Sequence, residues 1–135
     1  MRALRWLALI PASSAAFCLA VSATIAIHYL VEQHLCPAAD FDRGICNNRP
    51  LGMALEVIKH GGTALTVVIV ASVTVIVAPS HKRELLWVTL ALLLLLAAWF
   101  GYAASAESLF VAALGGGMLA AIAIPRHLRT DAPVA

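Results

Sequence analysis

The chain has 135 residues, of which 62% are hydrophobic and only 12% are charged, and its formal net charge is +2. A soluble domain needs more charged side chains on its surface, so this composition excludes an ordinary water-soluble protein. It also excludes a nucleic-acid-binding protein, which gathers many basic residues on one exposed surface. Four long apolar stretches instead predict an integral membrane protein, because about 20 apolar residues span the ~30 Å hydrocarbon core as a helix.

The four predicted spans together form one domain. They lack the period-two alternation of strands, and a backbone in lipid must satisfy its own hydrogen bonds, so we expect helices. Pro11 predicts a kink in the first span. Pro125 lacks a backbone N–H and predicts the end of the fourth span. We therefore predict an all-α four-helix membrane bundle with spans at about residues 4–31, 51–78, 85–104 and 108–124.

The first span has a competing interpretation as a secretory signal peptide. Arg2 and Arg5 precede an apolar run, and the small residues at 21–23 resemble a cleavage site. Apolar residues continue through Ile25 and Ile27, however, which makes the stretch long enough to cross a bilayer. We expect it to remain in the protein as a membrane anchor.

The basic residues predict the orientation. With both termini in the cytoplasm, six basic residues lie on the inner side and three on the outer side, as the positive-inside rule favours. The inner residues are Arg2, Arg5, Lys82, Arg83, Arg126 and Arg129, and the outer residues are Arg43, Arg49 and Lys59. The acidic residues add to this asymmetry, with Glu84 and Asp131 inside and Glu32, Asp40, Asp42, Glu56 and Glu107 outside.

The loop between the first two spans, residues 32–50, contains Cys36 and Cys46 with nine residues between them. This loop faces the oxidising side of the predicted topology, where disulfides persist. The turn-forming residues Pro37, Gly44, Asn47 and Asn48 suit a tight closed loop. We therefore predict a structural disulfide that closes a short extracytoplasmic loop. A redox-active pair is the alternative, although catalytic dithiols usually have the closer Cys-x-x-Cys spacing.

A metal site near this loop is a further alternative. His28, Glu32, His34 and Cys36 are close in sequence, and the first two share a helical face. Zinc requires three or four converging ligands, and Cys36 is expected to be in the disulfide. We therefore predict neither a metal nor a cofactor, and a histidine and a tyrosine at the membrane interface remain the simpler explanation.

The second span carries a polar group formed by Glu56, Lys59 and His60, which lie three and four residues apart on one helical face. Thr63, Thr66 and Thr74 extend roughly the same face. Ionisable residues in membrane segments often belong to proton, ion or substrate pathways. The alternative is that these charges pair with one another at the outer interface, since a helix over residues 51–78 exceeds the bilayer thickness.

Small residues predict where helices pack. Ala112, Gly116 and Ala120 recur every four residues in the fourth span, with Gly117 beside them, as in close helix–helix contacts. The first span contains a similar series of small residues at the same spacing, namely Ser14, Cys18 and Ser22. The run from Leu92 to Leu96 in the third span is apolar on every side and suits contact with lipid or a partner.

No catalytic or nucleotide-binding motif is evident in the sequence, and we lean against an enzyme. We predict a non-enzymatic accessory or assembly subunit of a larger complex in a bacterial inner membrane, in contact with lipid and with other membrane subunits or further copies of itself. The alternatives are a small oligomeric transporter or channel that uses Glu56, Lys59 and His60, and a membrane thiol oxidoreductase that uses Cys36 and Cys46.

Overall fold

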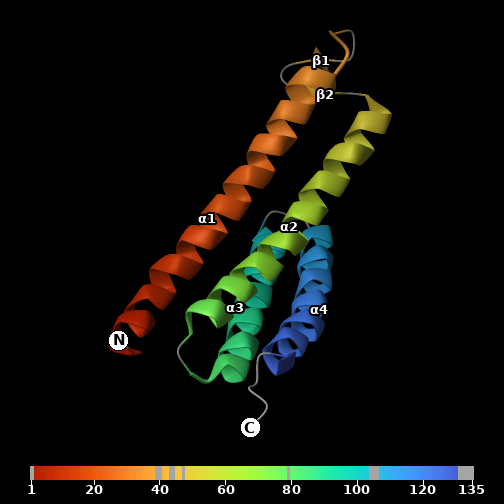
Figure 1. Ribbon diagram of the computed structural model, residues 1–135. Helices are drawn as coiled ribbons and strands as arrows, with labels where there is room; N and C mark the ends of the chain where they lie inside the picture. The colour runs from red at the N-terminus through yellow and green to blue at the C-terminus, as the bar shows by residue number, and fades with distance from the viewer. Residues whose placement is uncertain are drawn as a thin grey trace.

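Four helices make up most of the structure, a computed structural model that describes residues 2–38, 41–42, 45–46, 48–78, 80–103 and 107–130. They are α1 (Arg2–Leu35), α2 (Arg49–Val77), α3 (Lys82–Ala103) and α4 (Glu107–Thr130). All four are long and apolar enough to cross a membrane, which confirms the predicted class of an all-α protein with four membrane-spanning helices. Helix α1 begins and α4 ends at the same end of the molecule, opposite the α1–α2 connection (Figure 1).

Two helices extend beyond their predicted ends. Helix α1 continues to Leu35, so Glu32 and His34 are helical rather than part of the loop. Helix α4 does not end at Pro125 but continues to Thr130. A proline inside a membrane helix is tolerated where neighbouring groups satisfy the backbone that it disturbs. Pro11 is likewise inside a continuous helix.

The α1–α2 connection contains a feature that the sequence did not predict. Strands β1 (Phe41–Asp42) and β2 (Ile45–Cys46) form a small antiparallel hairpin in which Phe41 pairs with Cys46 and Asp42 with Ile45. Several predicted participants lie outside the described residues, namely Asp40, Arg43, Gly44, Asn47 and Asp131. The side chains of Arg2, Arg5, Asp42, Glu107 and Arg129 are also outside the described part of the chain.

Helix α2 occupies the centre of the arrangement. It packs against α1, α3 and α4, and α3 also packs against α4 (Figure 1). The buried core lies among α2, α3 and α4 and includes Val67, Ala71, Leu86 and Ala113. Helix α1 contributes no fully buried residue among its described side chains, because it packs chiefly against the single helix α2.

The small residues of α4 lie at its contacts with two other helices. Gly116 packs directly against the backbone of Ala64 in α2, and both Gly116 and Ala120 are buried. Gly117 is also buried, and a Cβ atom at this position would lie 4.0 Å from Leu94 Cδ2 of α3. Ala112 is half-buried. Small side chains therefore let α4 approach α2 and α3 together.

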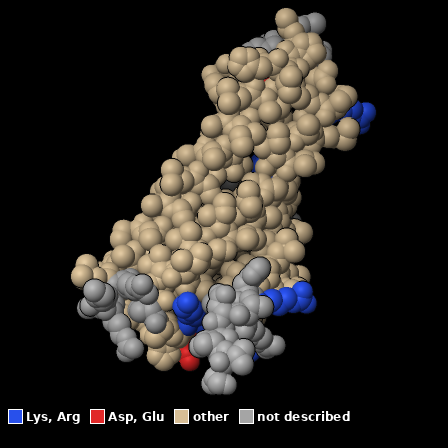
Figure 2. All heavy atoms as spheres, in the orientation of Figure 1, with Lys and Arg blue, Asp and Glu red and all other residues tan. Residues whose placement is uncertain are grey.

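Charged side chains lie mainly at the two ends of the molecule (Figure 2). Lys82 and Arg83 begin α3, and Arg126 lies near the end of α4, so these three bases share the end where α1 starts. Arg49 and Lys59 lie towards the other end, in the first turns of α2. The apolar zone between the two ends matches the hydrocarbon core of a bilayer.

Candidate functional site

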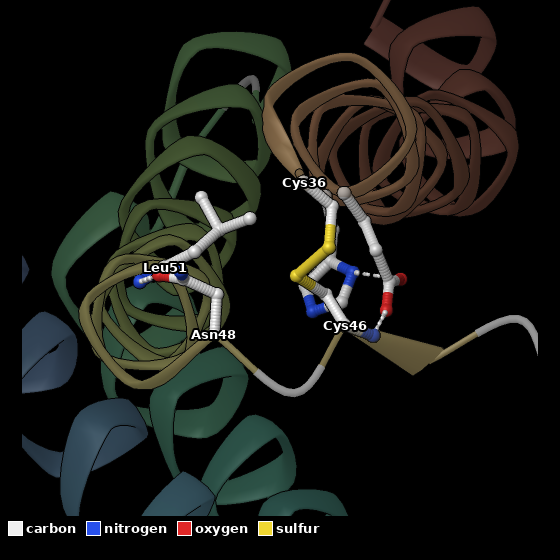
Figure 3. Close-up of a disulfide and its surroundings, with 6 residues drawn as sticks. Cys36, Cys46, Asn48 and Leu51 are labelled. Atoms are coloured by element: carbon white, nitrogen blue, oxygen red, sulfur yellow. Dashed lines mark hydrogen bonds and ion pairs between the residues drawn. A yellow bond between two sulfur atoms is a disulfide. The ribbon is translucent and has the colours of Figure 1, made fainter. Parts of the chain in front are cut away.

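The predicted disulfide joins the C-terminal end of α1 to the hairpin. The Cα atoms of Cys36 and Cys46 are 5.9 Å apart, a separation typical of disulfides. The backbone N–H of Cys46 also donates a hydrogen bond to Glu32 Oε1 at 3.2 Å. Figure 3 shows Cys36 at the end of α1 opposite Cys46 on β2. Glu32 and the disulfide thus hold the hairpin against α1.

The chain turns into α2 directly after the hairpin. Asn48 is the N-cap residue, and its Oδ1 accepts a hydrogen bond from Leu51 N–H at 3.2 Å (Figure 3). Pro50 occupies the first turn, where its missing N–H costs nothing. The cap lies two residues after Cys46 and α2 begins one residue later, so the disulfide ties the start of α2 to the end of α1.

Glu56, Lys59 and His60 come together on α2, two turns below this cap. Lys59 Nζ donates to Glu56 Oε1 at 2.7 Å, and His60 Nδ1 lies 3.4 Å from Glu56 Oε2. His60 Nδ1 is also 2.6 Å from the backbone oxygen of Glu56. The Glu56 side chain is 57% exposed, so this is an accessible group of charges rather than a buried one.

Helix α1 adds two titratable residues to this group. His28 Nδ1 lies 3.9 Å from Glu32 Oε2. Ile27, next to His28, and Ile58, next to Lys59, line the same crevice between the two helices. We refer to His28, Glu32, Glu56, Lys59 and His60 as the polar cluster. The sequence suggested His28 and Glu32 as candidates for a metal site but did not predict that His28 lies at the level of Lys59 on α2. Only the packing of α1 on α2 reveals that proximity.

The threonines below the polar cluster do not extend it. Thr63, Thr66 and Thr74 each donate to the carbonyl four residues earlier in α2, at 2.9, 2.8 and 2.7 Å. Thr74 Oγ1 also lies 2.9 Å from Ser13 Oγ of α1. Among the hydrogen bonds of the described residues, this is the one that joins these three threonines to α1. These hydroxyls are occupied within the helix pair, so they offer little to a passing ion.

An apolar crevice lies between α1 and α2 below the polar cluster. Its volume is about 330 Å³, and it is lined by small and aliphatic residues of both helices, among them Thr24, Ile27, Ile58, Gly61, Gly62 and Leu65. A hollow is visible between the two helices in Figure 2. Gly62 marks the closest approach, because its backbone packs against the Thr24 side chain.

The polar cluster is not a metal centre in the structure. Within the described part of the chain, no three His, Cys, Asp or Glu side chains converge closely enough to hold a metal ion. His34 is exposed at the end of α1, and Cys36 is in the disulfide. What the cluster offers chemically is an ammonium, two carboxylates and two imidazoles at an accessible surface.

The face of α1 that points away from α2 carries the series Ser14, Cys18 and Ser22. All three residues are exposed, whereas Ser13, Ala16 and Thr24 of the same helix face α2 or the core. Large exposed residues such as Leu7 and Ile25 flank this series on α1. The exposed residues of α3 are mostly large, and include Trp87, Val88, Leu92, Leu95, Leu96 and Trp99.

Neither protein-family models, nor curated proteins, nor solved structures provide a match to this chain.

Proposed function

We propose that this protein is a non-enzymatic accessory or assembly subunit of a larger complex in a bacterial inner membrane. The exposed face of α1 is the observation that carries the proposal. A helix surface that meets only lipid is well served by large apolar side chains, as on α3. The series Ser14, Cys18 and Ser22 instead allows a second helix to approach closely, and its hydroxyl groups can hydrogen-bond across such a contact.

The packing of α1 supports the same proposal. Helix α1 has one substantial neighbour, α2, and leaves the rest of its surface open. The fully buried residues of the core lie on α2, α3 and α4, and among the described residues α1 adds only the half-buried Ala16 to it. A helix held at the edge of the fold in this way is suited to join a partner subunit.

The proposed orientation places both termini in the cytoplasm and the disulfide-closed hairpin on the outer side. The bases Lys82, Arg83 and Arg126 are gathered at the end where α1 begins, as expected for a cytoplasmic face. The disulfide lies at the opposite end, where an oxidising compartment would maintain it. The alanine- and leucine-rich composition with few lysines is the basis for proposing a bacterial membrane.

Native mass spectrometry of the protein, gently extracted from its own membrane, tests the assembly proposal. The expected result is a companion protein in fixed stoichiometry. The double variant Ser14→Leu with Ser22→Leu should lose the companion, because leucine side chains hold a second helix away. The matched control, Ala91→Leu with Ala98→Leu, enlarges two exposed small residues on α3 and should keep it. A lone monomer, or equal retention in both variants, would contradict the proposal.

A small oligomeric transporter or channel is the second candidate, and the polar cluster is the observation that favours it. Its groups are accessible at one end of the helix pair, but the crevice below them is apolar. A pathway would therefore have to run between copies of the chain. In reconstituted vesicles, Glu56→Gln should abolish flux and leave the fold intact if this candidate is correct. Unchanged flux would eliminate it.

A further inference from the structure

We propose that the crevice between α1 and α2 binds one acyl chain of a zwitterionic phospholipid, whose phosphate and primary ammonium lie against the polar cluster. This site is independent of the proposed assembly function. It combines an apolar crevice between two helices that are apolar enough to cross a membrane with charged groups of both signs beside its hairpin end.

The lining of the crevice calls for an apolar occupant. Its two hydroxyl groups are already satisfied, since Thr24 donates to the carbonyl of Ala20 and Thr66 to that of Gly62. A polar ligand would lose its own hydrogen bonds there without replacement. The volume of about 330 Å³ lies at the lower end of the range for small-molecule sites. A single hydrocarbon chain, which is narrow and apolar, suits such a space.

Helix packing leaves this space open rather than closing it. Gly62 and Thr24 are in tight contact and fix how near the helices come. Beside them, a Cβ atom at Gly61 would have no neighbour within 4 Å. An unfilled gap forfeits the dispersion contacts of its lining. In a membrane, the hydrocarbon chains surrounding the protein are the molecules at hand to fill it.

The polar cluster lies on the same helix faces as the crevice wall. On α2, Lys59 shares a face with Gly62 and Thr66, which line the crevice three and seven residues later. On α1, His28 shares a face with Thr24 and Ala20 in the same way. Lys59 and His28 thus lie at the hairpin end of the crevice, next to its lining residues Ile58 and Ile27, where a headgroup attached to a buried chain would lie.

The charges of the cluster select the headgroup. Lys59 supplies a cation for a phosphate, and Glu56 beside it supplies a carboxylate for an ammonium group. A headgroup that carries a phosphate without an ammonium group would compete with Glu56 for Lys59 and leave that carboxylate without a partner. A phospholipid with phosphate and primary amine together, such as phosphatidylethanolamine, complements both signs.

Lipid retention measures this site directly. The protein is reconstituted into vesicles of equal parts phosphatidylethanolamine and phosphatidylglycerol, re-extracted, and examined by native mass spectrometry for bound lipid. The wild type should retain one phosphatidylethanolamine in preference to phosphatidylglycerol. Gly61→Leu should lower this retention at least about fivefold, because the new side chain occupies the crevice. Gly115→Leu is the matched control, since Gly115 on α4 has equally open surroundings.

A second variant tests the headgroup contact without altering the crevice. Lys59→Gln should lower retention of phosphatidylethanolamine about fivefold, as expected for one lost contact between a basic residue and a lipid headgroup. The proposal is overturned if Gly61→Leu retains lipid like the wild type, or if Gly115→Leu loses as much. It is also overturned if Lys59→Gln has no effect, if phosphatidylglycerol is retained equally, or if the bound molecule has the mass of another class of compound.

Discussion

At the scale of single residues, Gly62 determines how closely α1 and α2 approach each other. A Cβ atom at this position would lie 2.9 Å from Thr24 Cβ, an atom that side-chain rotation cannot move. We expect Gly62→Ala to lower the free energy of unfolding by about 1–2 kcal/mol, because overpacking outweighs the gain in helix propensity. Gly61→Ala, one residue earlier and unobstructed, should raise it by up to about 1 kcal/mol. Denaturant unfolding in detergent micelles measures both, and equal effects would contradict this view of the contact.

Some contacts within the polar cluster can be predicted from the sequence, and others cannot. The contact between Glu56 and Lys59 and that between Glu56 and His60 follow from spacings of three and four in one helix, so they could be predicted from periodicity alone. The position of His28 at the level of Lys59 could not, because it depends on the register of α1 against α2. That register is set by the contact of Gly62 with Thr24, and several faces of α1 carry residues small enough to make such a contact.

At the scale of elements, the contact between α2 and α4 tolerates an added side-chain atom less well than the contact between α1 and α2. A Cβ atom at Gly116 would lie 2.8 Å from Ala64 Cα, so backbone rather than a side chain would have to move. We expect Gly116→Ala to destabilise the protein by about 3 kcal/mol, the upper part of the range for overpacking. Gly115→Ala should have no such cost, because nothing lies within 4 Å of its added Cβ. The same unfolding measurement compares this adjacent pair, and a smaller cost for Gly116→Ala than for Gly62→Ala would refute the ranking.

The disulfide is the second feature that holds elements of the fold together. Cys36→Ser with Cys46→Ser should lower the free energy of unfolding by about 2–3 kcal/mol, because the closed loop spans only ten residue steps. If the bridge is structural, the double variant still recovers its companion protein at the same stoichiometry once folded. If instead the pair performs thiol chemistry, the variant loses an activity while its stability changes little. Parallel thermal unfolding and native mass spectrometry distinguish the two roles.

The elements also differ in how well the sequence predicts them. Four spans and the pairing of Cys36 with Cys46 follow from apolar length and from the position of the two thiols in one loop. The ends of α1 and α4 do not, since Leu35 and Thr130 lie past residues that usually end a membrane segment. The hairpin was also missed, because each strand has two residues and leaves no recognisable alternation. The hairpin follows instead from the geometry that the disulfide and the Asn48 cap impose on the connection between α1 and α2.

At the scale of the whole molecule, the distribution of charge and the disulfide both support the proposed orientation in the membrane. Bases gather at one end of the bundle and the disulfide lies at the other, so the two features give the same answer independently. If the protein inserted the other way, these bases would lie on the outer side and the disulfide would lie in the cytoplasm. The proposed orientation would place the polar cluster at the outer interface.

Labelling with a membrane-impermeant maleimide on intact spheroplasts tests this orientation. In a background with Cys18→Ser, the variant Cys36→Ser leaves Cys46 as a free thiol in the hairpin, and we expect it to be labelled. A second variant replaces all three native cysteines with serine and adds Ser80→Cys between α2 and α3, an exposed position beside Lys82 and Arg83. We expect no labelling there until the membrane is permeabilised. The reverse pattern would place the bases outside, against the charge distribution, and would require the disulfide to persist in a reducing compartment.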